Sequence, residues 1–430
     1  MNAHDDRHLL RAAFDAAVAA ADPLHILPPR LGAPPAGRVF VCGAGKAAAS
    51  MALAVERAWP RVALDGLVIT RYGHGLPTQR IRVVEAGHPV PDEAGEAAAR
   101  EMLARAATLG PGELLLALVS GGGSSLLALP APGLAMAELR QVTAQLLASG
   151  APIEQMNVVR KHLSAIAGGQ LALSAVQGGA SVRALIVSDV TGDEPADIAS
   201  GPCATDPSTY ADALAVLARW GVSPPVAVRD RLERGAAGAY PETPKPGDER
   251  FARVSNELVA TAHASLRAAA ATLESAGVRA VILGDTVTGE AREVAKVYAA
   301  LVREIRAHGA PFAPPVALLS GGECTVTLPP GVRGRGGRCS EFLLSLALEL
   351  EAVPGVCALA ADTDGIDGSE DNAGAWFDAT VLARARTRGA SARASLDAHD
   401  AWGYFHAADA LLHTGPTRTN VNDFRAILVR

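Results

Sequence analysis

The sequence is poor in aromatic residues and has no long apolar run. Phe, Trp and Tyr make up only 4% of its 430 residues, so the cores of the protein must be built mainly from aliphatic side chains. No apolar run approaches the ~20 residues that a helix needs to span a bilayer. The polar start of the chain, residues 1–10, also lacks the apolar segment of a secretory signal peptide. We therefore expect no membrane association.

Cysteine is scarce as well. The five cysteines are an odd number without CxxC spacing, which argues against a disulfide framework or a structural zinc site. This usage suits a reducing compartment, and we predict that the protein is cytoplasmic.

Neither sign of charge is in large excess. A net charge of −6 gives no general attraction to nucleic acid or to anionic lipid. With 49% hydrophobic and 20% charged residues, the chain is too apolar to be disordered. Its 430 residues exceed the roughly 250–300 that one core organises, so we expect two domains. We predict small-molecule partners and no nucleic acid, and the sequence leaves open whether the protein is a homodimer.

Short β-rich apolar runs alternate with Ala-rich helical stretches. This alternation predicts βαβ units, a largely parallel sheet and an α/β fold. The predicted strands are Arg38–Val41, Gly66–Thr70, Ile81–Glu85, Leu114–Val119, Val182–Val187, Val278–Leu283, Val316–Leu319, Val356–Ala360 and Ala426–Val429. The predicted helices are Leu9–Ala21, Ala47–Ala58, Glu93–Thr108, Ala137–Ala148, Ile153–Ile166, Gly289–His308 and Glu341–Glu351.

A segment rich in Gly, Pro and charge, Gly235–Glu249, has no hydrophobic period and is typical of an exposed connector. We therefore predict a first domain at residues 1–235, a linker at 236–249 and a second domain at 250–430.

The first glycine-rich loop, Gly43–Ala48, follows a predicted strand and opens a helix. It matches GxGxxA, the dinucleotide fingerprint. That fingerprint also requires an acidic residue at the end of the next strand, where Arg71 stands. A cation such as Lys46 opposes the helix dipole unless an anion lies between them. We predict that Gly43, Gly45 and Lys46 contact a phosphate, and the alternative for Lys46 is a solvated surface lysine.

A second loop, Ser120–Ser124, follows another apolar strand. Consecutive glycines followed by hydroxyls can form a nest of N–H and O–H donors for phosphate, although a simple tight turn is the alternative. Farther on, Arg160 and Lys161 diverge by about 100° on a helix, so we expect one of them to be solvated. The predicted anion contacts from this part of the chain are Ser120, Gly121, Gly122, Gly123, Ser124 and Arg160.

Carboxylates follow two further strands. Asp189 and Asp193 come after Val182–Val187, and three carboxylates, Asp362, Asp364 and Asp367, lie in a short turn after Val356–Ala360. Carboxylates at the end of a buried strand are costly unless they bind a cation, a hydroxyl or a basic side chain. We therefore consider magnesium ligation or general base catalysis for Asp189 and Asp193, with an ordinary turn residue as the alternative for Asp193. For the acidic turn we expect magnesium or substrate hydroxyls as ligands.

The second half also contains polar groups on glycine-flanked backbone. Glu323 ends a loop that resembles Ser120–Ser124, and Arg335 and Arg338 lie in Gly334–Glu341, where arginine can offer multidentate donors to phosphate or carboxylate. A hairpin without ligand is the alternative reading of that segment. Asn420 and Asn422 supply amides shortly before the last predicted strand.

Taken in order, these segments resemble the glycerate 2-kinase family with its C-terminal MOFRL domain. The matching segments are GAGKAA at Gly43, GHPVPDEAG at Gly87, SGGGSSLL at Ser120, MNVVRKHLSAIAGGQLA at Met156, SDVTGDEPADIASGP at Ser188, SGGECTVTL at Ser320, GRGGR at Gly334, TDGIDG at Thr363 and TNVND at Thr419. The sequence departs from the family pattern at Arg418, where Gly is usual, and at Cys339-Ser340, where Asn-Gln is usual.

The resemblance implies a Rossmann-like N-terminal domain and a smaller α/β domain that contains the MOFRL region, at about 315–430, with the active site in the cleft between them. It implies transfer of the ATP γ-phosphoryl group to the 2-hydroxyl of D-glycerate, with Mg²⁺. Phosphoryl transfer needs positioning and charge neutralisation. We assign these tasks to Lys46 and Arg338, and we expect Asp189 to orient or deprotonate the hydroxyl while sharing Mg²⁺ with Asp193 or Asp364.

Two other functions remain as alternatives. One is a hydroxypyruvate reductase that uses NADH or NADPH, for which GxGxxA is the best support and the missing ribose-binding acid is the main objection. The other is a non-catalytic phosphosugar-binding protein, which leaves the acidic loops unexplained.

Overall fold

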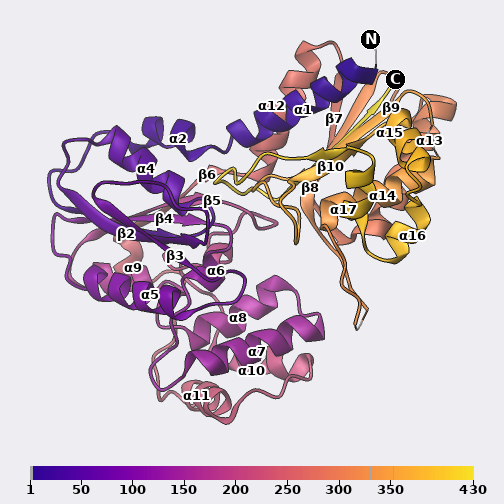
Figure 1. The fold of residues 1–430 in the computed structure, drawn as a ribbon. Coiled ribbons are helices and arrows are strands. Elements are labelled where there is room, and N and C mark those ends of the chain that lie inside the picture. Colours follow the sequence, from indigo (N-terminus) through magenta and orange to yellow (C-terminus); the bar gives the residue numbers. More distant parts are fainter. Residues whose placement is uncertain (1–2, 330, 352) are drawn as a thin grey trace. The chain divides into compact units, whose positions relative to one another are not determined.

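The computed structural model describes residues 3–329, 331–351 and 353–430, and the chain forms two compact units (Figure 1). One unit, here called the insert unit, is Pro23–Val259. The other, here called the terminal unit, combines Met1–Asp22 with Ala260–Arg430. Each unit has a six-stranded sheet of its own.

The sheet of the insert unit has the order β3-β2-β1-β4-β5-β6. Its strands are β1 (Val39–Ala44), β2 (Leu64–Arg71), β3 (Ile81–Ala86), β4 (Leu114–Ser120), β5 (Ser181–Val187) and β6 (Val254–Ala260). The pairs from β3 through β5 are parallel. This is the strand order of Rossmann folds, in which ligands bind at the carboxyl ends of the strands where the order reverses. Here the order reverses between β1 and β4.

Helices cover both faces of this sheet (Figure 1). Phe40, Cys42 and Ala44 alternate along β1 and join one core with α5 and α9, while α4 packs against β2 from the other side. Burial on both faces explains why these strands are nearly continuous apolar runs. The helices against the sheet are α4 (Ala48–Ala58), α5 (Glu93–Ala106), α6 (Gly123–Leu126) and α9 (Gln170–Val176). The short helices α2 (Pro23–Ile26) and α3 (Pro28–Leu31) pack on α4.

Four more helices of the insert unit form a layer with a core of its own. They are α7 (Met136–Ser149), α8 (Ile153–Leu163), α10 (Tyr210–Arg219) and α11 (Val226–Ala236). The 3₁₀ helices η1 (Ile198–Ser200) and η2 (Glu249–Arg253) lie in the connections.

The terminal unit has a mixed sheet with the order β11-β10-β9-β12-β8-β7. Its strands are β7 (Arg279–Glu290), β8 (Val316–Thr325), β9 (Val356–Asp362), β10 (Gly374–Phe377), β11 (Leu411–Leu412) and β12 (Asp423–Val429). Only β7 and β8 pair in parallel among the strands of this unit that the structure describes, and the other pairs are antiparallel. The expectation of a largely parallel sheet is therefore confirmed for the insert unit and wrong for this one.

Two adjacent residues of β12 pack against helices on opposite faces of this sheet. Phe424 contacts Phe14 of α1 with ring centroids 5.6 Å apart, whereas Arg425 lies over the ring of Phe342 in α14. Neighbouring strand residues point to opposite faces, so α1 and α14 lie on opposite sides. The helices are α1 (Ala3–Ala19), α12 (Ala262–Ser275), α13 (Ala291–His308), α14 (Arg338–Leu350), α15 (Ala379–Thr387), α16 (Ala392–Asp397) and α17 (Ala401–Ala407).

Every predicted strand and helix overlaps an observed element of the same type. The elements that were not predicted, apart from short helical turns, are β6, β10, β11, α9, α10, α11, α12, α15, α16 and α17. No described helix is both long enough and apolar enough to cross a membrane.

The division into units differs from the predicted boundary, because α1 belongs with the C-terminal part of the chain. Thr419 Oγ1 donates a 2.7 Å hydrogen bond to the carbonyl of Ala21, and Arg430 pairs with Asp6. An amphipathic pattern shows that α1 has an apolar face, but it does not show which sheet covers that face.

The predicted linker at 236–249 is held firmly within the insert unit. Glu242 Oε2 lies 3.2 Å from His162 Nε2, and Thr243 donates a 2.9 Å hydrogen bond to Asp206. Asp206 is completely buried beside Lys161, which is only 4% exposed. The chain leaves the unit only after β6 because these polar contacts anchor the segment. The expectation that Lys161 or Arg160 is solvated is also wrong, since neither is exposed.

We predict that Lys161→Met lowers the free energy of unfolding by about 3–5 kcal/mol, because it leaves a buried carboxylate without its cation. The cation lies 3.4 Å from Asp206 and 3.6 Å from Asp197. Urea unfolding measures the change. Arg100→Met is the control, because it breaks the largely exposed pair of Arg100 with Glu96 and should cost less than about 1 kcal/mol. Equal losses in the two variants would contradict a structural role for the Lys161 charge.

Candidate active site

The loop after β1 lies directly on β4, and its glycines are explained by that packing. A methyl group on Gly43 would overlap the backbone of Leu118, and one on Gly45 would overlap Ser120. Both glycines also have positive φ angles, 142° and 139°, which other residues rarely adopt. These glycines are therefore needed for the contact between β1 and β4, whether or not a ligand is bound.

The main-chain donors of this loop are already used within the unit. The N–H of Lys46 donates to the carbonyl of Gly121 at 2.8 Å, and the N–H of Ala47 donates to Ser120 Oγ at 3.0 Å. In a dinucleotide site the corresponding groups at the start of the helix would face the pyrophosphate. The GxGxxA match therefore does not form such a cradle in this structure.

The side chain of Lys46 lies over the loop after β4. A methyl group on Gly122 would lie 3.4 Å from Lys46 Cγ and 2.8 Å from His88 Nε2. Lys46 is half-buried, so the predicted alternative of a fully solvated surface lysine does not describe it. Its packing brings a cation to the point where the strand order reverses.

The loop after β4 presents main-chain donors that are not used. Gly122 has a φ of 77°, and the helical turn α6 follows it. No hydrogen bond from the N–H groups of Gly122, Gly123 or Ser124 is found within the described part of the chain. Successive N–H groups across a left-handed and then a right-handed residue form an anion-binding nest. This loop, rather than the one after β1, has the geometry of a phosphate site.

A chain of polar side chains extends from this nest to α8. Ser124 Oγ and Ser200 Oγ lie 2.9 Å apart, and Ser200 donates to Asn157 Oδ1 at 3.1 Å. Arg160 Nη1 lies 3.5 Å from the same oxygen. Burial lowers the pKa of Arg160, because the charged form is poorly solvated there. Arg160 is thus a partly buried cation at the end of this chain.

The backbone around Ser200 is strained. Ala199, Ser200 and Gly201 have consecutive positive φ angles of 53°, 58° and 58°. Each non-glycine residue in this conformation costs roughly 1–2 kcal/mol, and such strain is found mainly at functional sites. It is held in place by hydrogen bonds from the N–H groups of Gly168 and Gly169 to Ser200 and Gly201.

Asp189 and Asp193 lie just beyond the carboxyl end of β5. Both side chains are partly exposed. Asp193 has a φ of 55°, and its N–H donates to Val190 at 3.1 Å, so it also serves as a turn residue. Because β4 and β5 are neighbours in the sheet, Asp189 is on the same edge as the nest.

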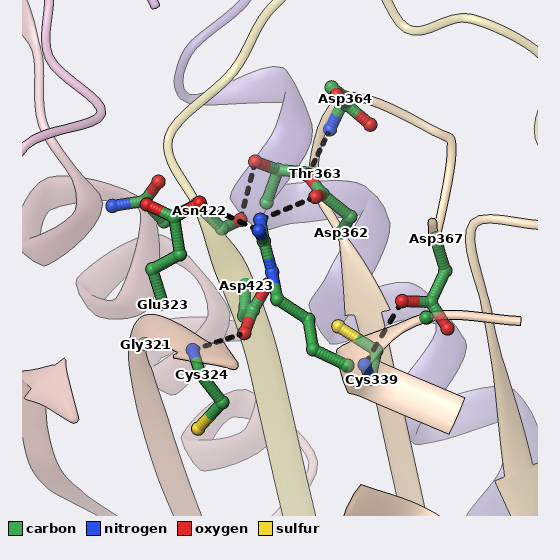
Figure 2. A network of polar contacts seen from close by, with 12 residues as sticks. Gly321, Glu323, Cys324, Cys339, Asp362, Thr363, Asp364, Asp367, Asn422 and Asp423 are labelled. Carbon is green, nitrogen blue, oxygen red and sulfur yellow. Dashed lines mark hydrogen bonds and ion pairs between the residues drawn. The ribbon is translucent and has the colours of Figure 1, made fainter. Parts of the chain in front are cut away.

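In the terminal unit, three carboxylates surround the guanidinium of Arg338. Asp423 lies 2.6 Å from Nε, Glu323 2.6 Å from Nη1 and Asp362 2.7 Å from Nη2. Figure 2 shows these three carboxylates converging from β12, β8 and β9. Burial alone would lower the pKa of Arg338, but the charges of Asp423, Asp362 and Glu323 outweigh it and hold the pKa well above its usual value.

The neighbouring groups hold this cluster in place. Arg425 is completely buried, pairs with Asp423 and donates to the carbonyl of Gly321 at 2.7 Å. Thr363 donates to the carbonyl of Asn422 at 2.7 Å, as Figure 2 shows. The geometry of Arg338 is therefore fixed by several strands at once.

The other residues predicted in this unit lie around the same cluster. Asp364 Oδ1 accepts from the N–H of Ile366 at 2.8 Å, and Asn420 Oδ1 accepts from the N–H of Asn422 at 3.2 Å. Arg335 instead stacks on Trp402, 3.9 Å from the ring centroid. It also approaches Glu370 at 3.4 Å, so these contacts give it a structural role.

Asp367 caps α14, the helix that begins at Arg338. Its two oxygens accept from the N–H groups of Cys339 at 3.0 Å and Ser340 at 2.8 Å. Burial raises the pKa of Asp367 to about 6, although these hydrogen bonds oppose the change. Ser340 also accepts from the N–H of Gly337 at 3.1 Å, so its hydroxyl helps to cap the same helix.

The departure at Arg418 also has a conformational consequence. Arg418 has a φ of 58°, a region that glycine enters at little cost and other residues do not. The glycine expected from the family pattern would fit this backbone without strain.

No group of three or more His, Cys, Asp or Glu side chains that could hold a metal ion is found among the described residues. Magnesium commonly binds through one or two carboxylates together with phosphate oxygens, and single carboxylates such as Asp193 or Asp364 can fill that role. The donor set therefore fits a magnesium ion that arrives with phosphate.

Sequence reasoning missed several residues of these clusters. They are His88, Asn157, Ser200, Asp423 and Arg425. All of these except Arg425 lie in segments that match the family pattern, but their individual roles could not be predicted because those roles depend on contacts between distant segments. Asp362 and Asp367 were predicted only as carboxylates of an acidic turn, without their contacts to Arg338 and to the start of α14.

Two family models match the chain. The "Domain of unknown function (DUF4147)" matches residues 9–233, and the "MOFRL family" matches residues 316–423.

Similar proteins include two with different names. A glycerate 2-kinase of Pyrococcus horikoshii is 39% identical over 91% of this chain and 88% of its own length. A protein of Agrobacterium vitis, named provisionally as a hydroxypyruvate reductase, is 51% identical over 98% of this chain and 94% of its own length. The crystal structure of a glycerate kinase from Thermotoga maritima superposes with a TM-score of 0.86 at 35% identity, over 99% of this chain and 100% of that one.

We predict that Asp367→Asn changes how stability depends on pH. The pKa of about 6 in the folded protein is above the ~3.9 of an unfolded chain. The folded state therefore holds an extra proton between these values, and the stability contributed below pH 4 is lost as the pH rises through 6. Removing this titration should make the slope of the unfolding free energy more positive by up to about 1.4 kcal/mol per pH unit between pH 4 and 6.

The control is Asp92→Asn. Asp92 caps α5 by accepting from the N–H of Gly95 at 3.0 Å. Burial raises its pKa, but that hydrogen bond and others outweigh it, so the pKa is lowered overall. Its contribution is present above the unfolded pKa and is lost in acid, so this variant should change the slope in the opposite direction. Urea unfolding at several pH values measures both slopes, and an unchanged slope for Asp367→Asn would show that this carboxyl does not titrate near 6.

Proposed function

Since the chain belongs to the glycerate 2-kinase family, in which a DUF4147 domain is followed by a MOFRL domain, we propose that it is itself a glycerate 2-kinase. The reaction transfers the γ-phosphoryl group of ATP to the 2-hydroxyl of D-glycerate and yields 2-phosphoglycerate and ADP. Kinase chemistry agrees with the names of relatives that align along most of the chain.

The observation that carries the proposal is the nest after β4 with Lys46 above it. N–H groups of Gly122, Gly123 and Ser124 are unused among the described residues, and the Lys46 side chain packs over Gly122. Donors that are fixed before the reaction and directed at phosphate oxygens stabilise developing charge without reorganisation. Phosphoryl transfer depends mainly on such positioning.

Each proposed catalytic residue has a distinct task. Lys46 neutralises charge on the transferring phosphoryl group. Asp189 accepts the proton of the 2-hydroxyl as the oxygen attacks phosphorus, because a carboxylate at a strand end can act as a general base. Arg338 supplies positive charge whose position is fixed by Asp362, Glu323 and Asp423.

Magnesium and ATP are part of the same proposal. When bound with the donor phosphates, magnesium would lower the negative charge that the attacking hydroxyl meets. Asp193 and Asp364 are the carboxylates that we propose for holding it. Ser120, Gly121, Ser124, Arg160, Glu323, Asn420 and Asn422 are proposed to bind substrate or phosphate, directly or by positioning those groups.

The reductase reading is the second candidate because a 51% identical relative carries that name. Two features count against it. The N–H groups of Lys46 and Ala47 are bonded to the β4 loop, and β2 ends in Arg71 rather than an acid. An arginine at that place can accommodate the 2′-phosphate of NADP, so the test must include both nicotinamide cofactors.

We also propose a cytoplasmic location. All five cysteines are buried free thiols, which agrees with a reducing compartment.

Two parallel assays decide between the functions. The purified protein is incubated with D-glycerate and Mg-ATP, and ADP release is followed. In parallel, loss of nicotinamide absorbance is followed with hydroxypyruvate and either NADH or NADPH. We expect ADP release together with 2-phosphoglycerate, identified by mass spectrometry and by enzymatic conversion. Cofactor oxidation without ADP release would replace the kinase with the reductase, and turnover of either kind would rule out a purely binding protein.

We predict that Lys46→Ala lowers kcat by two to four orders of magnitude, a loss of about 3–5 kcal/mol of transition-state stabilisation. The reason is that its charge acts on the transferring group. Lys296→Ala is the matched control, because Lys296 is an exposed lysine that pairs with neighbouring Glu293. Circular dichroism checks that both variants are folded. A near-normal rate for folded Lys46→Ala would remove this residue from the mechanism.

A further inference from the structure

A cavity of about 170 Å³ lies within the insert unit beside the nest. It is bounded by residues 89–91, α6, α7, α8 and the strained residues at 199–200. The segments before and after these helices follow β3, β4 and β5, so the cavity is at the carboxyl edge of the sheet. Ligands of open α/β sheets bind at this edge.

The lining includes a linked group of polar side chains, here called the polar end, and many aliphatic side chains. Ser124, Arg160 and Ser200 line the polar end and are joined through Asn157. Most of the remaining lining is aliphatic and comes from α7, α8 and the segment after α6. These residues are Leu127, Leu129, Leu139, Val142, Leu146, Leu147, Val159 and Leu163.

This lining does not suit glycerate, which carries a carboxylate or a hydroxyl on each of its three carbons. An apolar cavity of 150 Å³ holds a benzene molecule, and pockets for whole drug-sized ligands begin at roughly 300 Å³. A cavity of about 170 Å³ therefore suits one flat ring system with an attached polar group that extends out of it.

We propose that this cavity binds the adenine ring of the phosphoryl donor. The inference rests on the proposed kinase function, because that function requires a nucleotide. The ribose and phosphates then extend along Ser124 toward the N–H groups of Gly122 and Gly123, where Lys46 lies. The polar end of the cavity and the nest share Ser124, so the ring and the phosphates are bound by one continuous surface.

Two arginines in the lining support an anionic ligand. Arg160 is partly buried, and no carboxylate pairs with it in the described part of the chain. The Nε atom of Arg140 is buried without a hydrogen-bond partner among the described residues, although the charge of Arg140 is attracted by Asp92. A buried cation without a counter-ion is costly, and the phosphates of a nucleotide would relieve that cost at Arg160.

The proposal is tested with tryptophan substitutions on α7 that fill the cavity. Thr143→Trp and Ala144→Trp each place an indole at a lining position that is not fully buried. Gln141→Trp is the matched control, because Gln141 is an exposed residue of the same helix outside the lining. Binding of Mg-ADP and of tripolyphosphate, which has phosphates but no base, is measured by isothermal titration calorimetry. The KM for D-glycerate is measured as well.

We expect ADP to bind at least tenfold more weakly to Thr143→Trp and Ala144→Trp than to the wild type or to Gln141→Trp. Binding of tripolyphosphate and the KM for D-glycerate should change less than twofold. Unchanged ADP affinity in both lining variants would overturn the proposal, as would failure of the wild type to bind ADP. A rise in the KM for D-glycerate with unchanged ADP affinity would show that the cavity holds the acceptor instead.

The same data separate this proposal from the proposed function. ADP binding that is lost in the lining variants, in a protein without kinase turnover, would support the adenine cavity and overturn the kinase. Kinase turnover with the same KM for ATP in the wild type and the lining variants would support the kinase and overturn the adenine cavity.

Discussion

The close approach of the β1 loop to β4 is the constraint on which the insert-unit site depends. Gly43 and Gly45 permit it, because any side chain at either position would overlap β4 or Ser120. The approach ties the N–H groups of Lys46 and Ala47 to Gly121 and Ser120. It thereby places the Lys46 side chain over the second loop, where no hydrogen bond from the N–H groups of residues 122–124 is found within the described part of the chain. The glycines of the first loop are thus explained by packing, and the proposed chemistry rests on the cation and the nest.

In the terminal unit, ion pairs rather than close backbone packing hold the candidate site residues in place. Three carboxylates and the guanidinium groups of Arg338 and Arg425 form one network across β8, β9 and β12. Asp362, Asp423 and Arg425 are buried. Removing one partner from a buried pair typically costs 3–5 kcal/mol, so none of these three can move alone at little cost. Glu323 is exposed, and its pair with Arg338 contributes less. Such a network fixes the position of a cation more strictly than a flexible lysine would, which is the property that electrostatic catalysis requires.

The sequence predicted regular elements well because their signals are local. Apolar runs and helical periods located each strand and helix that was predicted, and the order of the motifs indicated the family. The pairing of strands that are far apart in the chain has no local signal, and this pairing creates the carboxylate cluster. Asp423 and Asp362 are direct partners in the register of β12 and β9, yet they are far apart in the chain. Membership of α1 in the terminal unit was missed for the same reason.

Two similar glycine-rich segments show most clearly what could not be predicted from the sequence, because their hydrogen bonds differ in the folded chain. Both Gly43–Ala48 and Ser120–Ser124 follow a buried strand and precede a helix, and both predicted phosphate contacts. Only in the folded chain does the hydrogen bonding differ. The N–H groups of Lys46 and Ala47 in the first loop are bonded to Gly121 and Ser120, whereas no such bonds from residues 122–124 of the second loop are found in the part of the chain that the structure describes. The donors that a glycine-rich loop leaves available to an anion therefore depend on the acceptors that the neighbouring strand supplies, and the spacing of its glycines does not reveal them.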